Sequence, residues 1–400
     1  MDLGLILSIL ELFWPIFNIF LYFVLAVFTF FSIINLITAF FSLKAQKVYE
    51  PITPRVSVIV RAWNDGSVVE RCIQSYLNQE YPKKEFEIII ADDGSQDKTK
   101  EICEYYAKRK CITYVHFPEH KNYKADVIDY VVKNVATGDI ILETDVDGVP
   151  PPNWIKEMVK PFSDSNVGGV TGTVMCGNSF QGSISKVRTI EDFWHFCIAL
   201  YGEYVMSGHG MLYGGSKGYT KEAWLKVGGH PKKTLIEDGE FALKLIEDGY
   251  KIVIIKSAPL IQEEVTTFEQ YMSEQKRWVK GGLDLDRLYG PAMKKNKLGY
   301  LLMLSNFSWE AAYFFSFIFL PYQLLLAIPI IINLSALYIG MFGLKAKGIF
   351  FLFALPYVWV GPLLRAIVIL SLLKNRILRR PITWTKVWHY PTQLKYPTFS

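Results

Sequence analysis

Three short acidic segments each follow an apolar run: Asn64-Asp65, Asp92-Asp93-Gly94-Ser95 and Asp145-Val146-Asp147-Gly148. Two aspartates placed as at 145 and 147 can offer carboxylate oxygens to one point. Hard divalent cations such as Mg²⁺ or Mn²⁺ take such oxygens together with substrate phosphates, and a cation held there neutralises a departing diphosphate. A turn or helix cap explains any single segment equally well, because Asp and Gly favour both. Only the three together indicate a site.

The elements around these segments alternate between strand and helix. Apolar runs at 56–60, 87–91, 114–117 and 140–144 are typical of buried strands, and the segments 67–78, 96–110 and 126–135 are typical of helices. This alternation predicts an α/β fold with a doubly wound, mostly parallel sheet. Ligands of such sheets bind just outside the carboxyl ends of the strands, which is where the acidic segments fall.

Charge and motif content exclude several classes of protein. The chain has no Gly-x-x-x-x-Gly-Lys-Ser/Thr, and no Gly-x-Gly-x-x-Gly follows its first strand, which disfavours P-loop and dinucleotide-binding enzymes. The net charge of +5 comes from the flanks, because residues 44–300 carry 34 basic and 35 acidic side chains, whereas the tail 374–400 has six basic and no acidic ones. A central region so close to neutrality is not expected to bind nucleic acid.

The acidic segments and the residues after them resemble the membrane-bound inverting glycosyltransferases of family 2, which include the cellulose, chitin, hyaluronan and poly-N-acetylglucosamine synthases. The resemblance spans about residues 52–290. It implies a cytosolic catalytic domain of the Rossmann-like GT-A fold, flanked by transmembrane helices. It also implies a nucleotide-sugar donor, by preference a UDP-sugar, and Mg²⁺ or Mn²⁺ as the cofactor.

The resemblance further implies a role for each residue that matches a family motif. The implied donor contacts are Asp65, Asp92, Asp93, Lys124, Asp145 and Arg277. The implied metal ligands are Asp145 and Asp147. The implied acceptor contacts are Gly215, Ser216, Glu237 and Trp278, with Asp238 as the catalytic base.

Two aspartates are candidates for the catalytic base, because Leu-Ile-Glu-Asp-Gly occurs twice, at 235–239 and at 245–249. The first copy opens a predicted helix and the second closes it, where Gly249 suits the position just past a helix end. A base must reach the acceptor hydroxyl at the cleft and accept its proton. We therefore expect Asp238 to be the base and Asp248 to be a helix cap.

Two positions depart from the family motifs. Glu274 stands where the family has Gln in Gln-x-x-Arg-Trp, and Ile236 replaces the Thr of Thr-Glu-Asp. Neither change removes a reacting group, but both lie on the acceptor side, so acceptor and processivity stay open. Arg277 suits a diphosphate because its guanidinium binds bidentately. Trp278 has two interpretations, a sugar-binding face and an aromatic anchor at a membrane interface.

Long apolar stretches flank the catalytic region. Ile16–Leu43, Ala311–Met341 and Ile349–Leu373 each exceed the ~20 apolar residues that a transmembrane helix needs. Residues before Pro15 are compatible with a separate short or interfacial helix. The expected parts are transmembrane segments at 1–46, the GT-A domain at 47–260, interfacial helices at 261–310, transmembrane helices at 311–373 and a basic, aromatic tail at 374–400.

Basic residues beside the apolar stretches predict an integral membrane protein with its catalytic domain and C-terminus in the cytoplasm. The predicted function is transfer of a sugar from a nucleotide-sugar donor to a growing polysaccharide, by metal-assisted single displacement with inversion. Transfer of one sugar to a polyprenyl or other lipid-linked acceptor stays open, because few polar residues (Glu310, Asn333 and Arg365) interrupt the C-terminal stretches. A non-enzymatic transporter or glycan-binding scaffold is least favoured, since transporters have more crossings. Membrane lipids are the other expected partner.

Overall fold

The computed structural model describes residues 3–121, 123–294, 296–302, 304–305, 323–344, 363–364, 367–372, 374–375 and 394. The predicted transmembrane region 311–373 therefore falls only partly within the described residues. Glu310, Arg365 and nearly all of the basic tail 374–400 lie outside them.

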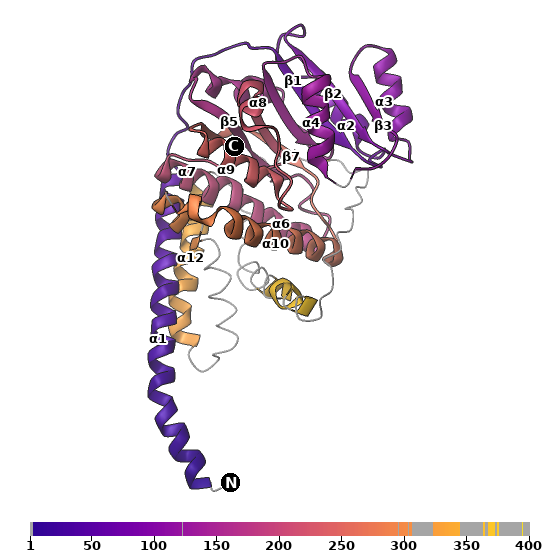
Figure 1. Cartoon of the computed structure of the whole chain (residues 1–400). Coiled ribbons are helices and arrows are strands. Elements are labelled where there is room, and N and C mark those ends of the chain that lie inside the picture. Colours follow the sequence, from indigo (N-terminus) through magenta and orange to yellow (C-terminus); the bar gives the residue numbers. More distant parts are fainter. Residues whose placement is uncertain are drawn as a thin grey trace.

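The strands of the described chain form one seven-stranded sheet in the order β3-β2-β1-β4-β6-β5-β7 (Figure 1). They are β1 (Val56–Ala62), β2 (Phe86–Asp93), β3 (Thr113–Phe117), β4 (Ile140–Asp145), β5 (Val167–Cys176), β6 (Ser216–Thr220) and β7 (Lys251–Gln262). Strands β1 to β4 are parallel to one another, β6 is antiparallel to both of its neighbours, and β5 pairs with β7 in parallel. The predicted mostly parallel α/β sheet is confirmed.

Successive side chains of a strand point to opposite faces of the sheet. Both faces carry apolar side chains, and helices cover both. Val58 and Val60 contribute to the core on one face, and Ile59 contributes to the core on the other. The first face is covered by α2 (Val69–Leu77), α3 (Thr99–Lys108) and α5 (Trp154–Val159). The second is covered by α4 (Lys124–Asn134), α8 (Lys221–Val227) and α9 (Glu237–Glu247).

Strands β5 and β6 have weak sequence signals and no strand was expected at either place. β5 contains three glycines where neighbouring side chains come close. A Cβ at Gly172 would lie 2.5 Å from the hydroxyl of Ser216, and one at Gly169 would lie 3.2 Å from Leu212. Glycine lowers strand propensity but permits this close packing.

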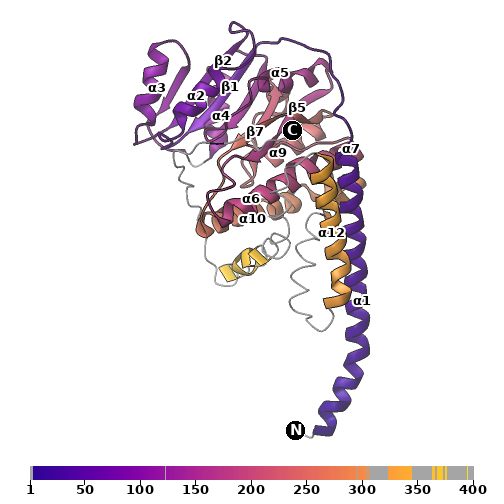
Figure 2. The same cartoon turned by 180° about the vertical axis from the view of Figure 1, so that it is seen from behind.

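A layer of helices runs beneath the sheet. α6 (Ser183–Asp192) continues through the π-helical segment η2 (Phe193–Leu200) into α7 (Tyr201–Ser207). α10 (Phe268–Met293) lies alongside α6 in both views (Figures 1 and 2). The region 261–310, expected to hold interfacial helices, thus contains α10, while β7 continues to Gln262, past the domain end expected at 260.

The N-terminal helix α1 (Leu3–Ser42) is continuous through Pro15, so the separate short helix considered before this residue does not form. Proline removes one backbone hydrogen bond, and the apolar residues on both sides continue the helix. α1 extends away from the sheet, with α12 (Gln323–Gly343) beside it (Figure 1). Within the described residues, Trp14–Ser42 is the one helical segment whose length and apolar composition suit a membrane crossing, and Ala327–Gly343 is apolar but shorter.

Buried polar side chains join α1 to α12. The amide of Asn35 donates to the side-chain oxygen of Asn333 at 3.1 Å, and the amide of Asn333 donates to the hydroxyl of Ser32 at 2.9 Å. Polar groups in apolar surroundings are costly unless they are hydrogen-bonded. Asn333 therefore links two helices.

Candidate active site

The carboxyl ends of β1, β2 and β4 bring the three acidic segments to one edge of the sheet. In the parallel register Ala62 lies beside Asp92, and Arg61 lies beside Asp145. The structure therefore confirms that these segments lie at one edge of the sheet, as predicted.

Asp145, the last residue of β4, forms an ion pair with Lys124 at the start of α4. Its Oδ1 lies 2.5 Å from the ammonium nitrogen, and 40% of the Asp145 side chain is exposed. Burial acts to raise the pKa of Asp145, but the charge of Lys124, helped by Lys217 and Arg277, outweighs burial and lowers that pKa. The carboxylate is charged at neutral pH.

Asp147 lies just past the end of β4 and is almost fully buried. The amide of Gln262 donates to its Oδ2 at 3.2 Å, and the guanidinium of Arg71 donates to its backbone oxygen at 3.4 Å. Asp145 and Asp147 offer hard oxygens that fit Mg²⁺ or Mn²⁺ when substrate phosphates complete the coordination. Among the described residues, no three His, Cys, Asp or Glu side chains are grouped to hold a metal ion, so such a cation would depend on the substrate for further ligands.

Asp92 and Asp65 stabilise the loops at this edge. Asp92 is fully buried and accepts hydrogen bonds from the backbone nitrogen of Ser95 at 3.0 Å and from the hydroxyl of Tyr114 at 2.5 Å. The carboxylate of Asp65 accepts from the backbone nitrogen of Trp63 at 2.8 Å. Both carboxylates thus make local contacts, and their donor-binding roles stay predictions.

Asp93 is the centre of a polar cluster with an aromatic pair beside it. It is fully buried, pairs with Arg61 and accepts from the backbone nitrogen of Lys121 at 2.8 Å, and its Oδ2 lies 2.9 Å from Nδ1 of His120. Trp63 stacks on His120 with ring centroids 3.8 Å apart. An aromatic face beside a carboxylate suits a nucleoside, whose base stacks and whose hydroxyls donate hydrogen bonds.

Asp238 lies in the first turn of α9, with 18% of its side chain exposed and Oδ1 in contact with the ammonium of Lys217. Burial acts to lower the pKa of Lys124, but Asp145, with smaller contributions from Asp238 and Glu237, raises it. Asp238 therefore belongs to the same charge cluster as Asp145. Burial, followed by the charge of Asp238, raises the pKa of Glu237.

Asp248 closes α9, as expected. It is the residue at the helix end, its carboxylate lies 2.7 Å from the ammonium of Lys226, and Gly249 follows with φ of 91°. The first copy of Leu-Ile-Glu-Asp-Gly thus opens the helix and the second ends it. The catalytic role of Asp238 stays a prediction.

The predicted acceptor segment passes between Asp238 and β7. A Cβ at Gly214 would lie 2.6 Å from Oδ2 of Asp238, and one at Gly215 would lie 2.7 Å from the amide oxygen of Gln262. Ser216 instead starts β6, is fully buried and accepts a hydrogen bond from the indole of Trp154 at 3.1 Å. The structure gives Ser216 a packing contact, and its predicted acceptor contact stays a prediction.

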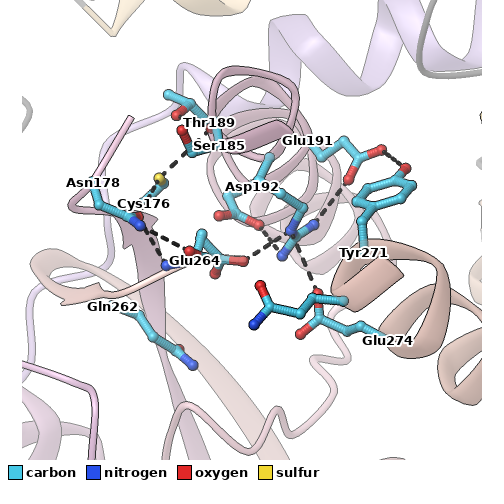
Figure 3. Close-up of polar contacts among 12 residues, drawn as sticks. Cys176, Asn178, Ser185, Thr189, Glu191, Asp192, Gln262, Glu264, Tyr271 and Glu274 are labelled. Carbon is cyan, nitrogen blue, oxygen red and sulfur yellow. Dashed lines mark hydrogen bonds and ion pairs between the residues drawn. The ribbon is translucent and has the colours of Figure 1, made fainter. Parts of the chain in front are cut away.

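Helix α10 is joined to α6 by a buried cluster that includes Glu191, Asp192, Glu264 and Glu274 (Figure 3). The guanidinium of Arg188 makes ion pairs with Glu191, Asp192, Glu264 and Glu274 at 2.9, 2.8, 2.8 and 3.7 Å. Burial and mutual repulsion outweigh the single guanidinium, so the pKa of Asp192 is raised and that of Glu274 is raised to about 7. Glu274, which departs from the family Gln, thus serves to connect two helices.

Arg277 and Trp278 follow Glu274 on α10. The charge of Arg277 contributes to lowering the pKa of Asp145. The ring centroid of Trp278 lies 4.8 Å from the guanidinium carbon of Arg188, a cation–π contact. The sugar-binding role of Trp278 stays a prediction.

Sequence reasoning missed Lys217, Glu143 and Arg188. Glu143 has a signal, because it is an acid inside strand β4, ahead of the strand-end residue Asp145. Lys217 has none, since its partners Glu143 and Asp238 are close in space but distant in sequence. Arg188 has a partial signal, because Glu191 and Asp192 follow it at helical spacing, whereas Glu264 and Glu274 are distant in sequence.

Residues 57–226 match the family profile described as Glycosyl transferase family 2. A β-monoglucosyldiacylglycerol synthase from Trichormus variabilis is 26% identical over 260 residues, 64% of this chain and 54% of its own length. A probable glycosyltransferase, YdaM, from Bacillus subtilis is 24% identical over 231 residues, 57% of this chain and 55% of its own length. The chain spans about half the length of the curated relatives it matches.

Among solved structures, a mannosyltransferase from Pyrobaculum calidifontis in complex with GDP-Man and Mn²⁺ is similar, with a TM-score of 0.56 and 18% sequence identity, covering 80% of this chain and 96% of that one. This similarity shows the fold. Residues 57–226 thus match glycosyltransferase family 2, and the described chain has a GT-A-like α/β fold.

Proposed function

We propose that this protein transfers a sugar from a nucleotide-sugar donor to a lipid acceptor at a membrane surface, with inversion at the anomeric carbon. The observation that carries the proposal is the strand-end charge cluster. Asp145 and Asp147 lie there within the family 2 segment, and Asp238 reaches the same cluster from α9.

In the proposed reaction, Asp238 accepts the proton of the acceptor hydroxyl while the hydroxyl oxygen attacks the anomeric carbon. The new glycosidic bond forms as the bond to the nucleoside diphosphate breaks on the opposite side. Lys124 and Arg277 supply positive charge near Asp145, where the leaving diphosphate gathers negative charge. Asp145 and Asp147 would hold Mg²⁺ or Mn²⁺, which neutralises phosphate charge when bound.

A lipid acceptor is supported by two observations. The relative from Trichormus variabilis is named for a glucosyl-diacylglycerol product. In addition, Trp14–Ser42 within α1 has the length and composition of a membrane-crossing helix, and aromatic side chains such as Phe23 and Phe30 are exposed on it. The relatives named above are not polymer synthases by name, so the polysaccharide acceptor suggested by the family resemblance takes second place.

The test uses the purified full chain in lipid nanodiscs with Mg²⁺ or Mn²⁺ and a panel of UDP- and GDP-sugars. Diacylglycerol, a polyprenyl phosphate and an oligosaccharide are offered in turn, and nucleoside-diphosphate release and product mass are measured. A lipid carrying one added sugar is expected, and EDTA should abolish its formation until Mn²⁺ or Mg²⁺ is restored. A ladder of long glycans would favour the polysaccharide acceptor. No release of nucleoside diphosphate from any donor would overturn the proposal in favour of a non-enzymatic protein.

A further inference from the structure

Lys217 is a buried cation that the proposed reaction does not use. It lies in β6 with 1% of its side chain exposed, its ammonium contacts Oδ1 of Asp238, and it lies 3.1 Å from Oε2 of Glu143. Because Glu143 is in β4 and Asp238 is in α9, one ammonium joins three elements.

Tyr219 and His230 hold the other carboxylate oxygen of Glu143. The hydroxyl of Tyr219 donates to its Oε1 at 2.5 Å, and Nε2 of His230 lies 3.2 Å from the same oxygen. The other ring nitrogen of His230 lies 2.7 Å from Asp129. Lys217 is therefore held by a carboxylate that has little freedom to move.

The charge of Lys217 is stable. Burial acts to lower its pKa, but the carboxylates of Asp238 and Glu143 outweigh burial and raise it. A permanently charged and immobile ammonium is suited to orient a neighbouring carboxylate, and it is unsuited to donate a proton.

The two oxygens of Asp238 have different surroundings. Oδ1 contacts Lys217, whereas Oδ2 lies toward Gly214, where a Cβ would come within 2.6 Å. Because residue 214 is glycine, no Cβ crowds Oδ2. Part of the Asp238 side chain is exposed, and Oδ1 is occupied by Lys217, so Oδ2 is the oxygen left for a substrate.

We propose that Lys217, anchored by Glu143, is a positioning residue that holds Oδ1 of Asp238 and presents Oδ2 to the acceptor hydroxyl. This inference rests on the proposed function, with Asp238 as the base. The proton moves from the hydroxyl to Oδ2, the freed oxygen forms the glycosidic bond, and Lys217 neither gains nor loses a proton.

The test compares K217M/E143Q and K217R with the wild-type chain. The double variant removes both buried charges together, because Lys217→Met alone would leave Glu143 without its cation. We expect the kcat of K217M/E143Q to fall about a hundredfold, the cost of a small misplacement of a catalytic group, with little change in the KM for the donor. K217R keeps the charge and should recover part of the loss. Lys226→Met, in α8 and paired with Asp248 at the exposed end of α9, is the matched control and should keep wild-type kcat.

A second comparison places K217M/E143Q in a D238N background. If Lys217 acts through Asp238, the added substitutions cause no further loss there. A folded K217M/E143Q with wild-type kcat would overturn the inference, as would equal losses in kcat and donor affinity without recovery in K217R. A wild-type chain without turnover would overturn the proposed function itself, which is a distinguishable result.

Discussion

The two ends of α9 carry the same five residues, Leu-Ile-Glu-Asp-Gly, and each end forms a Lys–Asp pair. At the first copy, 18% of the Asp238 side chain and 1% of the Lys217 side chain are exposed. At the second, the exposed fractions of Asp248 and Lys226 are 35% and 52%. The residue types are identical, so the difference comes from where the fold places them. Water screens the second pair but not the first.

Helix direction gives the two ends different chemistry. Asp238 lies at the start of α9, where the helix dipole favours negative charge, and it shares a charge cluster with the strand ends. Asp248 lies at the end of α9, where Gly249 turns the chain toward β7. A repeated motif thus places one aspartate at the site and the other at the surface.

The largest expected effect separates the two aspartates. D238N should lower the kcat of sugar transfer by about 10²- to 10⁴-fold, because the acceptor hydroxyl loses its base. D248N should leave kcat within the error of the assay. Nucleoside-diphosphate release in nanodiscs measures both. If D248N abolished transfer and D238N did not, the two ends would have to exchange roles.

The second effect concerns the two glycines of the repeat. Gly249 has φ of 91°, whereas Gly239 lies within α9. G249A should cost about 1–2 kcal/mol, because a Cβ is disfavoured in the left-handed region. G239A gains helix propensity but brings its Cβ to 3.3 Å from Leu285, so its net effect should be smaller. Thermal unfolding of the two variants checks this, and equal losses would contradict it.

The sequence predicts the parallel half of the sheet and both ends of α9, because the signals for these elements lie within short segments of the chain. The strands at 56–60, 87–91 and 140–144 are mostly apolar runs, and Gly249 is a recognisable helix terminator. Sequence reasoning missed β5, whose glycines serve close packing with Ser216 and Leu212. It also missed Lys217, because the pairing with Glu143 and Asp238 depends on three separate elements meeting in space.

The third effect is a pH dependence at the buried end. Burial and the charge of Asp238 raise the pKa of Glu237. Such an acid binds more protons in the folded than in the unfolded chain, so stability is greatest below the ordinary glutamate pKa of about 4.3 and falls as pH rises toward the folded value. E237Q should remove this loss. The change of its Tm with pH should therefore be smaller than that of the wild-type chain, by roughly 1 °C. An unchanged slope in E237Q would contradict the assignment.

The smallest effect is expected at the exposed pair. Exposed ion pairs contribute little, because water screens the charges and both side chains lose freedom when they pair. K226M, D248N and the double variant should therefore all unfold within roughly 1 °C of the wild-type chain, and added salt should change none of them. At the buried end, K217M should lower Tm clearly, since it leaves Glu143 and Asp238 without their shared cation. If the coupling between Lys226 and Asp248 equalled that between Lys217 and Asp238 in matched double-mutant cycles, burial would not be what separates the two ends of α9, and the catalytic assignment of Asp238 would lose its physical basis.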